Sequence, residues 1–402
     1  MSIFKRIGAI LSAVWWGFVI SPICDRVSLP ILGKGGFVFI VHPRVIEDVL
    51  LQFPFFAVLS KSKMEALLRK LPPVIGPRID TGNGVRGRVV FVPQTVEMMN
   101  SDRLGARDAI VRAAQTANRM GAKYIGTGAL TASMTRLGFD LRNVGPVVTT
   151  GHAATSLIGA QMVLEGLVRM GIDPGLATVA VVGVGSIGQS VATILAKQVA
   201  RLILIDVSEK IPRLNRLSQQ LDGTGVPAIE VVAREEGGYS RLIEADAIFT
   251  ATSESEAWLT ADMLKRGSMV VDDSAPFSMS QQEAEKHDGL VLQVLAMAPG
   301  VDCHFWFSRG VGRRYQYTCL AELIALAHHG NGTKGVIGPV TLDAVSVMSF
   351  LLQEAGYDGL VFTSFGVEIS EAEWERARAE VQSTPPTWIV LGENAPLQLV
   401  VL

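Results

Sequence analysis

The clearest chemical signature in the chain is a set of three glycines spaced as Gly-x-Gly-x-x-Gly. An apolar run precedes them and a helix-like sequence follows. In this context the first glycine makes a tight turn, the second lets the backbone approach a pyrophosphate, and the third lets helix and strand pack closely. The amides and dipole of the following helix favour a phosphate charge. A tight turn that binds no nucleotide is the alternative. The predicted cofactor-binding residues here are Gly183, Gly185, Ser186, Ile187 and Gly188.

An acidic residue, Asp206, ends the next apolar run, 202–205. A carboxylate at the end of the second strand accepts hydrogen bonds from the ribose hydroxyls and repels a 2′-phosphate. No arginine follows directly, and Lys210 is the nearest cation in the sequence. We therefore predict NAD(H) as the cofactor, in preference to NADP(H). A role in capping the following helix is the alternative.

Small polar residues end the later strands of the same domain. In a doubly wound sheet, ligands lie outside the carboxyl ends of the strands. Residues 247–253 read as such a strand end, and Asp272 and Asp273 end the next strand. The two acids either hold a loop or face the cleft. The residues that we expect to line the nicotinamide ribose are Thr250, Ala251 and Thr252.

Hydroxyl-rich turns occur in the preceding part of the chain. Hydroxyl and N–H groups at strand ends can polarise a carbonyl oxygen as a hydride arrives. His152, at a predicted helix start, is either a general acid, with its charged form disfavoured by the helix dipole, or a structural residue. The candidate catalytic or substrate residues in these turns are Thr131, Ser133, Thr135, Thr149, Thr150, His152 and Thr155.

Arg44 follows a predicted strand in the sequence His42-Pro43-Arg44. Its guanidinium can grip a carboxylate or phosphate with two parallel hydrogen bonds. A surface turn with a salt bridge is the alternative. The adjacent pair His328-His329 lacks the spacing of a metal site, so we predict no bound metal.

Bulk composition narrows the classes of function. The 402-residue chain has a net charge of -2, which gives none of the basic surplus of a nucleic-acid-binding protein. Its three cysteines are widely spaced, which fits a reducing cytoplasm and excludes a disulfide framework. A mean hydropathy of +0.33 is high, and it suggests exposed apolar surface for a lipid-like substrate, a membrane or a subunit contact.

Alternating strand and helix patterns predict an α/β protein of two domains. We expect a doubly wound Rossmann domain over 171–299 and a smaller parallel α/β domain over 37–170, completed by helices in 300–366. An apolar extension, 1–36, and a C-terminal helix and tail, 367–402, flank them. The strands are expected at 37–41, 87–93, 123–126, 147–150, 179–182, 202–205, 229–232, 247–252, 269–271 and 290–294. The helices are expected at 45–51, 63–71, 102–120 with Ser101 as its cap, 152–170, 315–328, 341–354 and 371–381.

Residues 7–20 are apolar almost throughout and follow Lys5 and Arg6. The run is short for a transmembrane helix, and no signal-peptide cleavage site follows it. Trp15 and Trp16 suit an interface between water and lipid. We expect a helix that either packs on the protein or makes a peripheral membrane contact.

With these pieces in place, the chain from Phe37 to Gly366 resembles the long-chain fatty acyl-carrier-protein reductases of cyanobacteria and the relatives called predicted amino-acid dehydrogenases. The resemblance rests on several segments in order: FVFIVHPR, GTGALTASMT, VTTGHAAT before ATVAVVGVGSIG, LKRGSMVVDDSAP and TCLAELIALA. It implies reduction of a long-chain acyl thioester to an aldehyde by a reduced nicotinamide.

The resemblance also implies a cysteine, just before the fifth nucleotide-domain strand, that accepts the acyl group. This sequence has Ser268 at that position, and a serine needs an adjacent base to match a thiolate. Cys303 lies next to His304 and is a candidate substitute, whereas Cys319 reads as a core residue of an apolar helix. The family's basic residue after the second strand implies NADPH, from which Asp206 departs.

The leading hypothesis is therefore reduction of an acyl thioester, carried on acyl carrier protein or CoA. Direct hydride attack, with hydroxyl groups holding the oxyanion, would need no cysteine. An NAD-dependent dehydrogenase of a small amino, keto or hydroxy acid is the second hypothesis, with Arg44 on the carboxylate. The third is a non-catalytic NAD(H)-binding subunit that docks on a partner enzyme.

Overall fold

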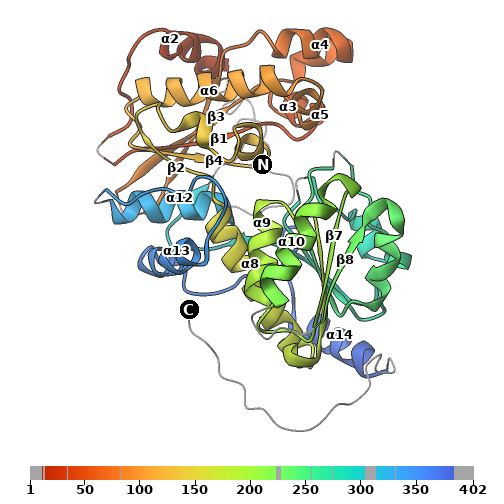
Figure 1. Cartoon of the computed structure of the whole chain (residues 1–402). Coiled ribbons are helices and arrows are strands. Elements are labelled where there is room, and N and C mark those ends of the chain that lie inside the picture. The colour runs from red at the N-terminus through yellow and green to blue at the C-terminus, as the bar shows by residue number, and fades with distance from the viewer. Residues whose placement is uncertain are drawn as a thin grey trace. The chain divides into compact units, whose positions relative to one another are not determined.

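The computed structural model describes residues 11, 14–33, 35–82, 84–222, 228–254, 256–274, 276–303, 314–330 and 332–383. The basic residues before the apolar run and the apolar tail after Ser383 lie outside the described residues. The chain forms two compact units (Figure 1). Unit 1 contains Met1–Ala154, Ala296–Val340 and Phe350–Gly359, and unit 2 contains Thr155–Leu295, Thr341–Ser349 and Leu360–Leu402.

Unit 2 is built on a six-stranded parallel sheet. Its strands are β6 (Thr178–Val182), β7 (Arg201–Asp206), β8 (Ala228–Ala233), β9 (Ala247–Thr250), β10 (Met269–Asp272) and β11 (Leu290–Gln293). They lie in the order β11-β10-β9-β6-β7-β8, with every neighbouring pair parallel. This is the doubly wound dinucleotide-binding order, and its switch point lies between β6 and β9. The predicted fold class and all six predicted strands are confirmed.

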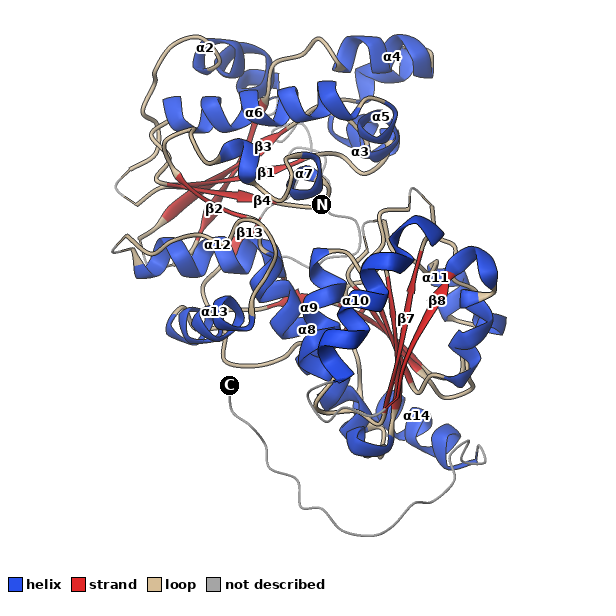
Figure 2. Cartoon of the chain, in the orientation of Figure 1, coloured by secondary structure: helices blue, strands red, loops and turns tan. Residues whose placement is uncertain are grey.

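Helices cover the sheet of unit 2, with α9 and α10 on one face (Figure 2). The central strands are apolar apart from their end residues because both faces are buried, and Ala180, Ile203, Ile248 and Val270 have no exposed surface. The helices are α8 (His152–Arg169), which begins in unit 1, α9 (Ser186–Leu195), α10 (Ile211–Asp222), α11 (Gln281–Ala284) and α14 (Glu371–Ser383). Short 3₁₀ turns include η5 (Ser208–Lys210), η6 (Arg234–Glu236) and η7 (Gly238–Glu244), and β15 (Thr363–Ser364) and β16 (Val367–Glu368) form a hairpin.

Unit 1 has a six-stranded mixed sheet. Its strands are β1 (Phe37–Val41), β2 (Val74–Asp80), β3 (Arg86–Phe91), β4 (Tyr124–Thr127), β5 (Val147–Thr149) and β13 (Asp302–Cys303), in the order β13-β2-β3-β1-β4-β5. The four strands from β3 to β5 are parallel, as predicted. The prediction of a wholly parallel sheet is wrong, because β2 runs antiparallel to both β3 and β13.

The sequence analysis missed β2 because it contains Gly76 and Pro77, which usually break a strand. The register between β2 and β3 shifts between Ile75 and Arg78. At such an irregularity a proline need not supply a ladder hydrogen bond. The apparent break in the sequence is therefore a local irregularity within a strand.

Helices cover both faces of the sheet in unit 1, with α6 on one side and α12 on the other (Figure 1). The predicted cap of α6 is corrected: Ser101 ends α5, and the Asp102 carboxylate accepts the Gly105 amide at 2.9 Å. The helical elements are η1 (Trp15–Ile20), a turn of π-helix, α2 (Ser21–Cys24), α3 (Ile46–Gln52), η2 (Pro54–Val58), α4 (Lys61–Leu68), α5 (Val96–Ser101), α6 (Arg103–Arg119), α7 (Thr131–Met134), α12 (Thr318–His329) and α13 (Leu342–Glu354), which the division between units cuts.

The described part of the N-terminal apolar run packs on β2. The Ile75 amide donates to Ser21 Oγ at 2.7 Å, and the Arg88 guanidinium stacks 3.6 Å from the ring centre of Trp16. Packing, one of the two predicted roles, is therefore observed for these residues. None of the helices in the described ranges has the length and apolar character needed to cross a membrane.

Candidate functional site

The three glycines of the β6–α9 loop differ in what they require. Gly183 has a φ of +83°, and a Cβ on it would lie 2.5 Å from the carbonyl oxygen of Ala251. A Cβ on Gly188 would lie 2.3 Å from the carbonyl oxygen of Gly183. A Cβ on Gly185 would meet no atom within 4 Å. The fold of this loop thus requires the first and third glycines, while the second leaves open space in front of α9.

An unpaired polar atom lies at this same opening. Ser186 is the first residue of α9, and its buried Oγ has no hydrogen-bond partner within the described residues. Ile187, next along the helix, is half-buried. A buried hydroxyl beside unpaired helix amides and open space fits an anionic ligand of phosphate type. The residues predicted to hold the pyrophosphate of a dinucleotide therefore fit that group.

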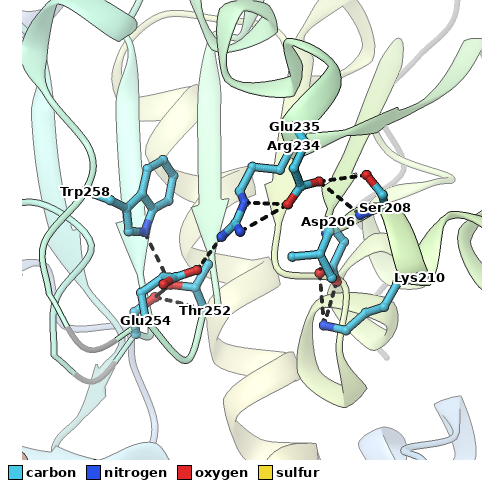
Figure 3. Close-up of polar contacts among 10 residues, drawn as sticks. Asp206, Ser208, Lys210, Arg234, Glu235, Thr252, Glu254 and Trp258 are labelled. Atoms are coloured by element: carbon cyan, nitrogen blue, oxygen red, sulfur yellow. Dashed lines mark hydrogen bonds and ion pairs between the residues drawn. The ribbon is translucent and has the colours of Figure 1, made fainter. Parts of the chain in front are cut away.

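Asp206 ends β7 with only 6% of its surface exposed. Its carboxylate accepts the Val207 amide at 2.9 Å, and both its oxygens pair with Lys210 Nζ, at 2.9 and 3.1 Å (Figure 3). Lys210 is itself half exposed. The carboxylate is thus held at the strand end where a ribose would lie in this fold.

A second cation, Arg234, lies beside this strand end and was missed from the sequence. It follows Ala233, the residue of β8 that pairs with Asp206. Its guanidinium pairs with Glu235 and Glu254, and Glu235 also accepts from both the amide and the hydroxyl of Ser208 (Figure 3). Only the register between β7 and β8 brings Arg234 near Asp206, so the local sequence held no signal for it.

The ends of β9 and β10 are tied together by Asp272. This buried carboxylate accepts the Thr250 hydroxyl at 2.7 Å and the amides of Ser274 and Ser278 at 2.8 and 2.7 Å. The Thr252 amide donates to Ser274 Oγ at 3.0 Å. Of the two roles considered for Asp272, it therefore performs the first and holds a loop. The Thr250 hydroxyl is thus engaged by Asp272, whereas Ala251 and Thr252 are half-buried just after the carboxyl end of β9.

Asp273 is the next residue, directly beyond the carboxyl end of β10. Its amide donates to the Thr250 carbonyl at 2.9 Å, and its side chain is half-buried. Burial and the neighbouring Asp272 carboxylate raise the pKa of Asp273 well above its usual range. Asp273 therefore places a carboxyl group whose ionised form is disfavoured just beyond the carboxyl end of β10.

Ser268 lies at the amino end of the parallel strands, whereas the glycine loop lies at their carboxyl end. Ser268 directly precedes Met269, the first residue of β10. Across β9, Met269 is level with Val179 near the start of β6, whereas Asp272 is level with Val182 at the end of β6, next to the glycine loop. Four residues of strand separate these positions by roughly 13 Å. The serine is 1% exposed, and its Oγ has no partner within the described residues. The prediction that Ser268 takes up an acyl group next to the nicotinamide is therefore corrected.

The hydroxyl groups predicted to polarise a carbonyl in unit 1 mostly serve the backbone. Thr131 donates to the Gly128 carbonyl, Thr135 to the Thr131 carbonyl and Thr150 to the Val336 carbonyl, at 2.7, 2.7 and 3.1 Å. Ser133 is exposed on α7, and Thr155 is buried in α8. The structure thus gives these threonines a structural use and leaves Ser133 alone in contact with solvent.

Glu322 is a buried acid to which the sequence pattern gave no role. It lies on α12 with no exposed surface. Its carboxylate accepts the Thr149 hydroxyl and the amides of Gly151 and Ala154, the latter two at 3.0 and 2.9 Å. Burial raises its pKa, while these hydrogen bonds oppose that shift. The one signal in the sequence was a single acid within the apolar segment TCLAELIALA. The structure shows that this acid accepts hydrogen bonds from the residues at the start of α8.

Arg44 lies after β1, with 19% of its side chain exposed. Its Nε lies 3.4 Å from the Asp48 carboxylate, which also accepts its backbone amide at 3.0 Å. The salt bridge that the sequence analysis gave as an alternative is therefore formed. Asp48 thus holds the guanidinium in place through its contacts with both Nε and the backbone amide of Arg44.

Two buried histidines share the carboxyl end of this sheet. His42 Nε2 accepts the Leu130 amide at 3.2 Å, so its Nδ1 carries the proton and donates to the Pro43 carbonyl at 2.9 Å. His152 is 7% exposed, and its Nδ1 has no partner within the described residues. Burial lowers the pKa of each to about 4. His152 is thus neutral at pH 7 because of burial, and it is unsuited to act as an imidazolium acid.

These two histidines predict how stability depends on pH. Their folded-state pKa lies below the ordinary value of 6.5, so the unfolded chain binds protons first as the pH falls. Each histidine is expected to remove up to about 3 kcal/mol of stability between pH 6.5 and pH 4. Urea unfolding at several pH values in this range should show the loss. The free energy of unfolding should fall less steeply with decreasing pH in His152→Gln than in the wild type. An equal slope in both proteins would contradict the assignment.

The cysteines differ from the sequence-based expectation. Cys303 pairs with Ile79 in the strand β13, and its side chain lies outside the described residues. Cys319 is half-buried in the first turn of α12, whereas we expected a core residue. A Cβ on Gly151 would lie 2.1 Å from Cys319 Cβ, so the thiol-bearing residue lies against the turn that precedes His152. Within the described residues, no group of acidic, histidine or cysteine side chains could hold a metal ion.

Comparison with known proteins gives similarity at the level of the fold. No family model matches the sequence, and no curated protein matches it. A chain of the dipicolinate synthase from Bacillus halodurans is 18% identical, with a TM-score of 0.29 over 42% of this chain and 56% of that one. The present chain thus spans little more than half the length of that relative.

Two further solved structures match over a larger share. The shikimate 5-dehydrogenase from Listeria monocytogenes, solved with shikimate and NAD, is 12% identical, with a TM-score of 0.34 over 67% of this chain and 89% of that one. The D-lactate dehydrogenase from Escherichia coli is 16% identical, with a TM-score of 0.29 over 64% and 82%. At these scores the matches carry no argument about function, which rests on the geometry above.

Proposed function

We propose that this chain is an NAD(H)-dependent oxidoreductase that transfers a hydride directly to and from a small amino, keto or hydroxy acid. The strongest support is the set of groups at the carboxyl ends of the parallel strands in unit 2. The open glycine loop, the Asp206 carboxylate and the Asp273 carboxyl group all lie at this end of the sheet. Ser268, which stands at the position of the family's nucleophilic cysteine, lies at the amino end of β10 instead.

The proposed roles follow from where the side chains are held. When bound, the reduced nicotinamide would supply a hydride to a carbonyl carbon. We propose Asp273, at the carboxyl end of β10, as the group that would give the carbonyl oxygen its proton, because burial beside Asp272 raises the pKa of its carboxyl group. In unit 1, Asp48 orients the Arg44 guanidinium, which we propose as a binding group for a carboxylate.

The cofactor preference is also a proposal, and it rests on charge. Asp206 presents a carboxylate at the ribose position, while Lys210 and Arg234 are already paired with acids. A 2′-phosphate would have to displace Glu235 or Glu254 and approach the Asp206 carboxylate. We therefore propose NAD(H) in preference to NADP(H).

The cofactor preference can be tested with Asp206→Ala. We expect NADH affinity to fall about tenfold and NADPH affinity to rise, because the ribose acceptor is lost and Lys210 becomes available to a phosphate. Fluorescence titration of both nucleotides measures the change. Glu209→Ala, an exposed acid of the same turn, serves as the control and should leave the ratio unchanged. If Asp206→Ala keeps the wild-type ratio, the carboxylate does not select the cofactor.

Cys319 supports a second candidate function, reduction of an acyl thioester bound to acyl carrier protein or CoA. It is half-buried in the first turn of a helix, against the Gly151 turn and beside the neutral His152. Helix N-termini favour the thiolate form of a cysteine, and a thiolate can accept an acyl group. In this version the acyl acceptor is Cys319, and neither Ser268 nor Cys303 takes part.

One panel of substrates separates the two candidates. NADH oxidation would be followed with small keto acids, with and without ammonium, and with short- and long-chain acyl-CoA and acyl carrier protein. Turnover of a small acid that is lost in Arg44→Ala supports the first proposal. Release of aldehyde that is lost in Cys319→Ala replaces it with the second. Tight NADH binding without turnover on any of these compounds would overturn both.

A further inference from the structure

The N-terminal part of unit 1 carries a cluster of apolar side chains that nothing in the described structure covers. Among the described residues, more than half of the exposed large apolar side chains lie between residues 11 and 67. We call five of them the apolar patch. They are Trp15, Phe18 and Val19 on η1, and Phe55 and Val58 on η2, and they are 37–87% exposed.

Ring contacts show that η1 and η2 form one surface. Phe18 lies 6.2 Å from Phe55 between ring centres, and both rings pack on the buried Phe53, at 5.6 and 5.8 Å. Phe56 lies below them at 4.6 Å from Phe55. The buried rings fix the position of the exposed ones, so the patch is a built surface of the fold.

Charges of both signs lie beside the patch, and two of the lysines have no acid paired with them among the described residues. Helix α4 begins three residues after Val58 and contains Lys61, Lys63 and a single acid, with Arg69 and Lys70 following. Lys61 and Arg69 pair with Glu97 and Asp102. Within the described residues, no partner is found for the exposed ammonium groups of Lys63 and Lys70. The sequence before Asp25 adds two cations and no acid.

We propose that the apolar patch rests on an anionic lipid bilayer, with Trp15, Phe18, Phe55 and Val58 at the level of the headgroups and Lys63 and Lys70 facing lipid phosphates. Exposed tryptophan and phenylalanine beside unpaired lysines are the chemistry of interfacial binding. The proposal is independent of the reaction proposed above.

The experiment is sedimentation of the full chain with vesicles of phosphatidylcholine alone or mixed with phosphatidylglycerol. Binding is expected to anionic vesicles, with a blue shift of tryptophan emission. Val58→Ser should weaken the partition coefficient about tenfold, since an inserted valine is lost. Lys63→Gln and Lys70→Gln should each weaken it about fivefold on anionic vesicles only.

Val367→Ser is the matched control, because Val367 is also a highly exposed valine, at 70% against 87% for Val58, and lies in unit 2, so this variant should bind as the wild type does. Thermal unfolding of every variant checks that the fold is kept. The proposal is overturned if the wild type stays in the supernatant with both vesicles, or if Val58→Ser sediments as well as the control. It is also overturned if sedimentation equilibrium shows a dimer that Val58→Ser converts to a monomer.

Discussion

Gly185→Val is expected to leave the protein folded and to weaken NADH binding about 100-fold, or about 2.7 kcal/mol. A Cβ on Gly185 meets no protein atom within 4 Å, and its φ of -73° is open to other residues. The added side chain would fill the space in front of α9, which a pyrophosphate needs for contact with the backbone amides. Quenching of NADH fluorescence measures the affinity, and circular dichroism shows whether the fold is kept.

A suitable control for this variant is Gly359→Val. Gly359 also has open space around its Cβ position and lies outside the left-handed region. It should bind NADH like the wild type. If Gly185→Val binds NADH as tightly as the control does, the nucleotide does not occupy the β6–α9 loop, and the proposed site is wrong.

Glu322→Ala is expected to have the largest effect on stability, with a loss of about 3–5 kcal/mol. The substitution removes the acceptor for the Thr149 hydroxyl and for two amides at the start of α8, which all remain buried without another partner. Glu322→Gln keeps one carbonyl acceptor and should lose about half as much. Urea unfolding measures both differences.

Glu165→Ala provides the comparison for this prediction. Glu165 is an exposed acid on α8 that pairs with Arg169 at 3.1 Å, so its loss should cost less than about 1 kcal/mol. If Glu322→Ala unfolds at the same urea concentration as Glu165→Ala, the buried carboxylate does not hold the start of α8.

The fold of unit 2 could be predicted from the sequence because most of its strands are short apolar runs. Strands such as Val179–Val182 are buried on both faces, so their pattern is continuous and is bounded by glycine or polar residues. The strand β2 could not be found in this way. Its signal is interrupted by Pro77, and only the completed sheet shows that the register shifts there.

Residues of the candidate site could be predicted only where they lie close together in the sequence. The glycine loop and Asp206 belong to one strand–helix–strand unit, whereas Arg234 and Glu322 reach their places through contacts distant in sequence. The position of Ser268 was inferred from a family resemblance. Its place at the amino end of β10 became visible only when strand direction and register were known.

Cofactor binding by the β6–α9 loop and Asp206 is tested most directly by calorimetric titration of the wild-type chain with NADH and, in parallel, with NADPH. We expect one NADH bound per chain, with a dissociation constant in the micromolar range and an affinity at least tenfold above that for NADPH. No heat of binding with either nucleotide at millimolar concentration would contradict this expectation, because an open glycine loop beside Asp206 would then have no dinucleotide to hold.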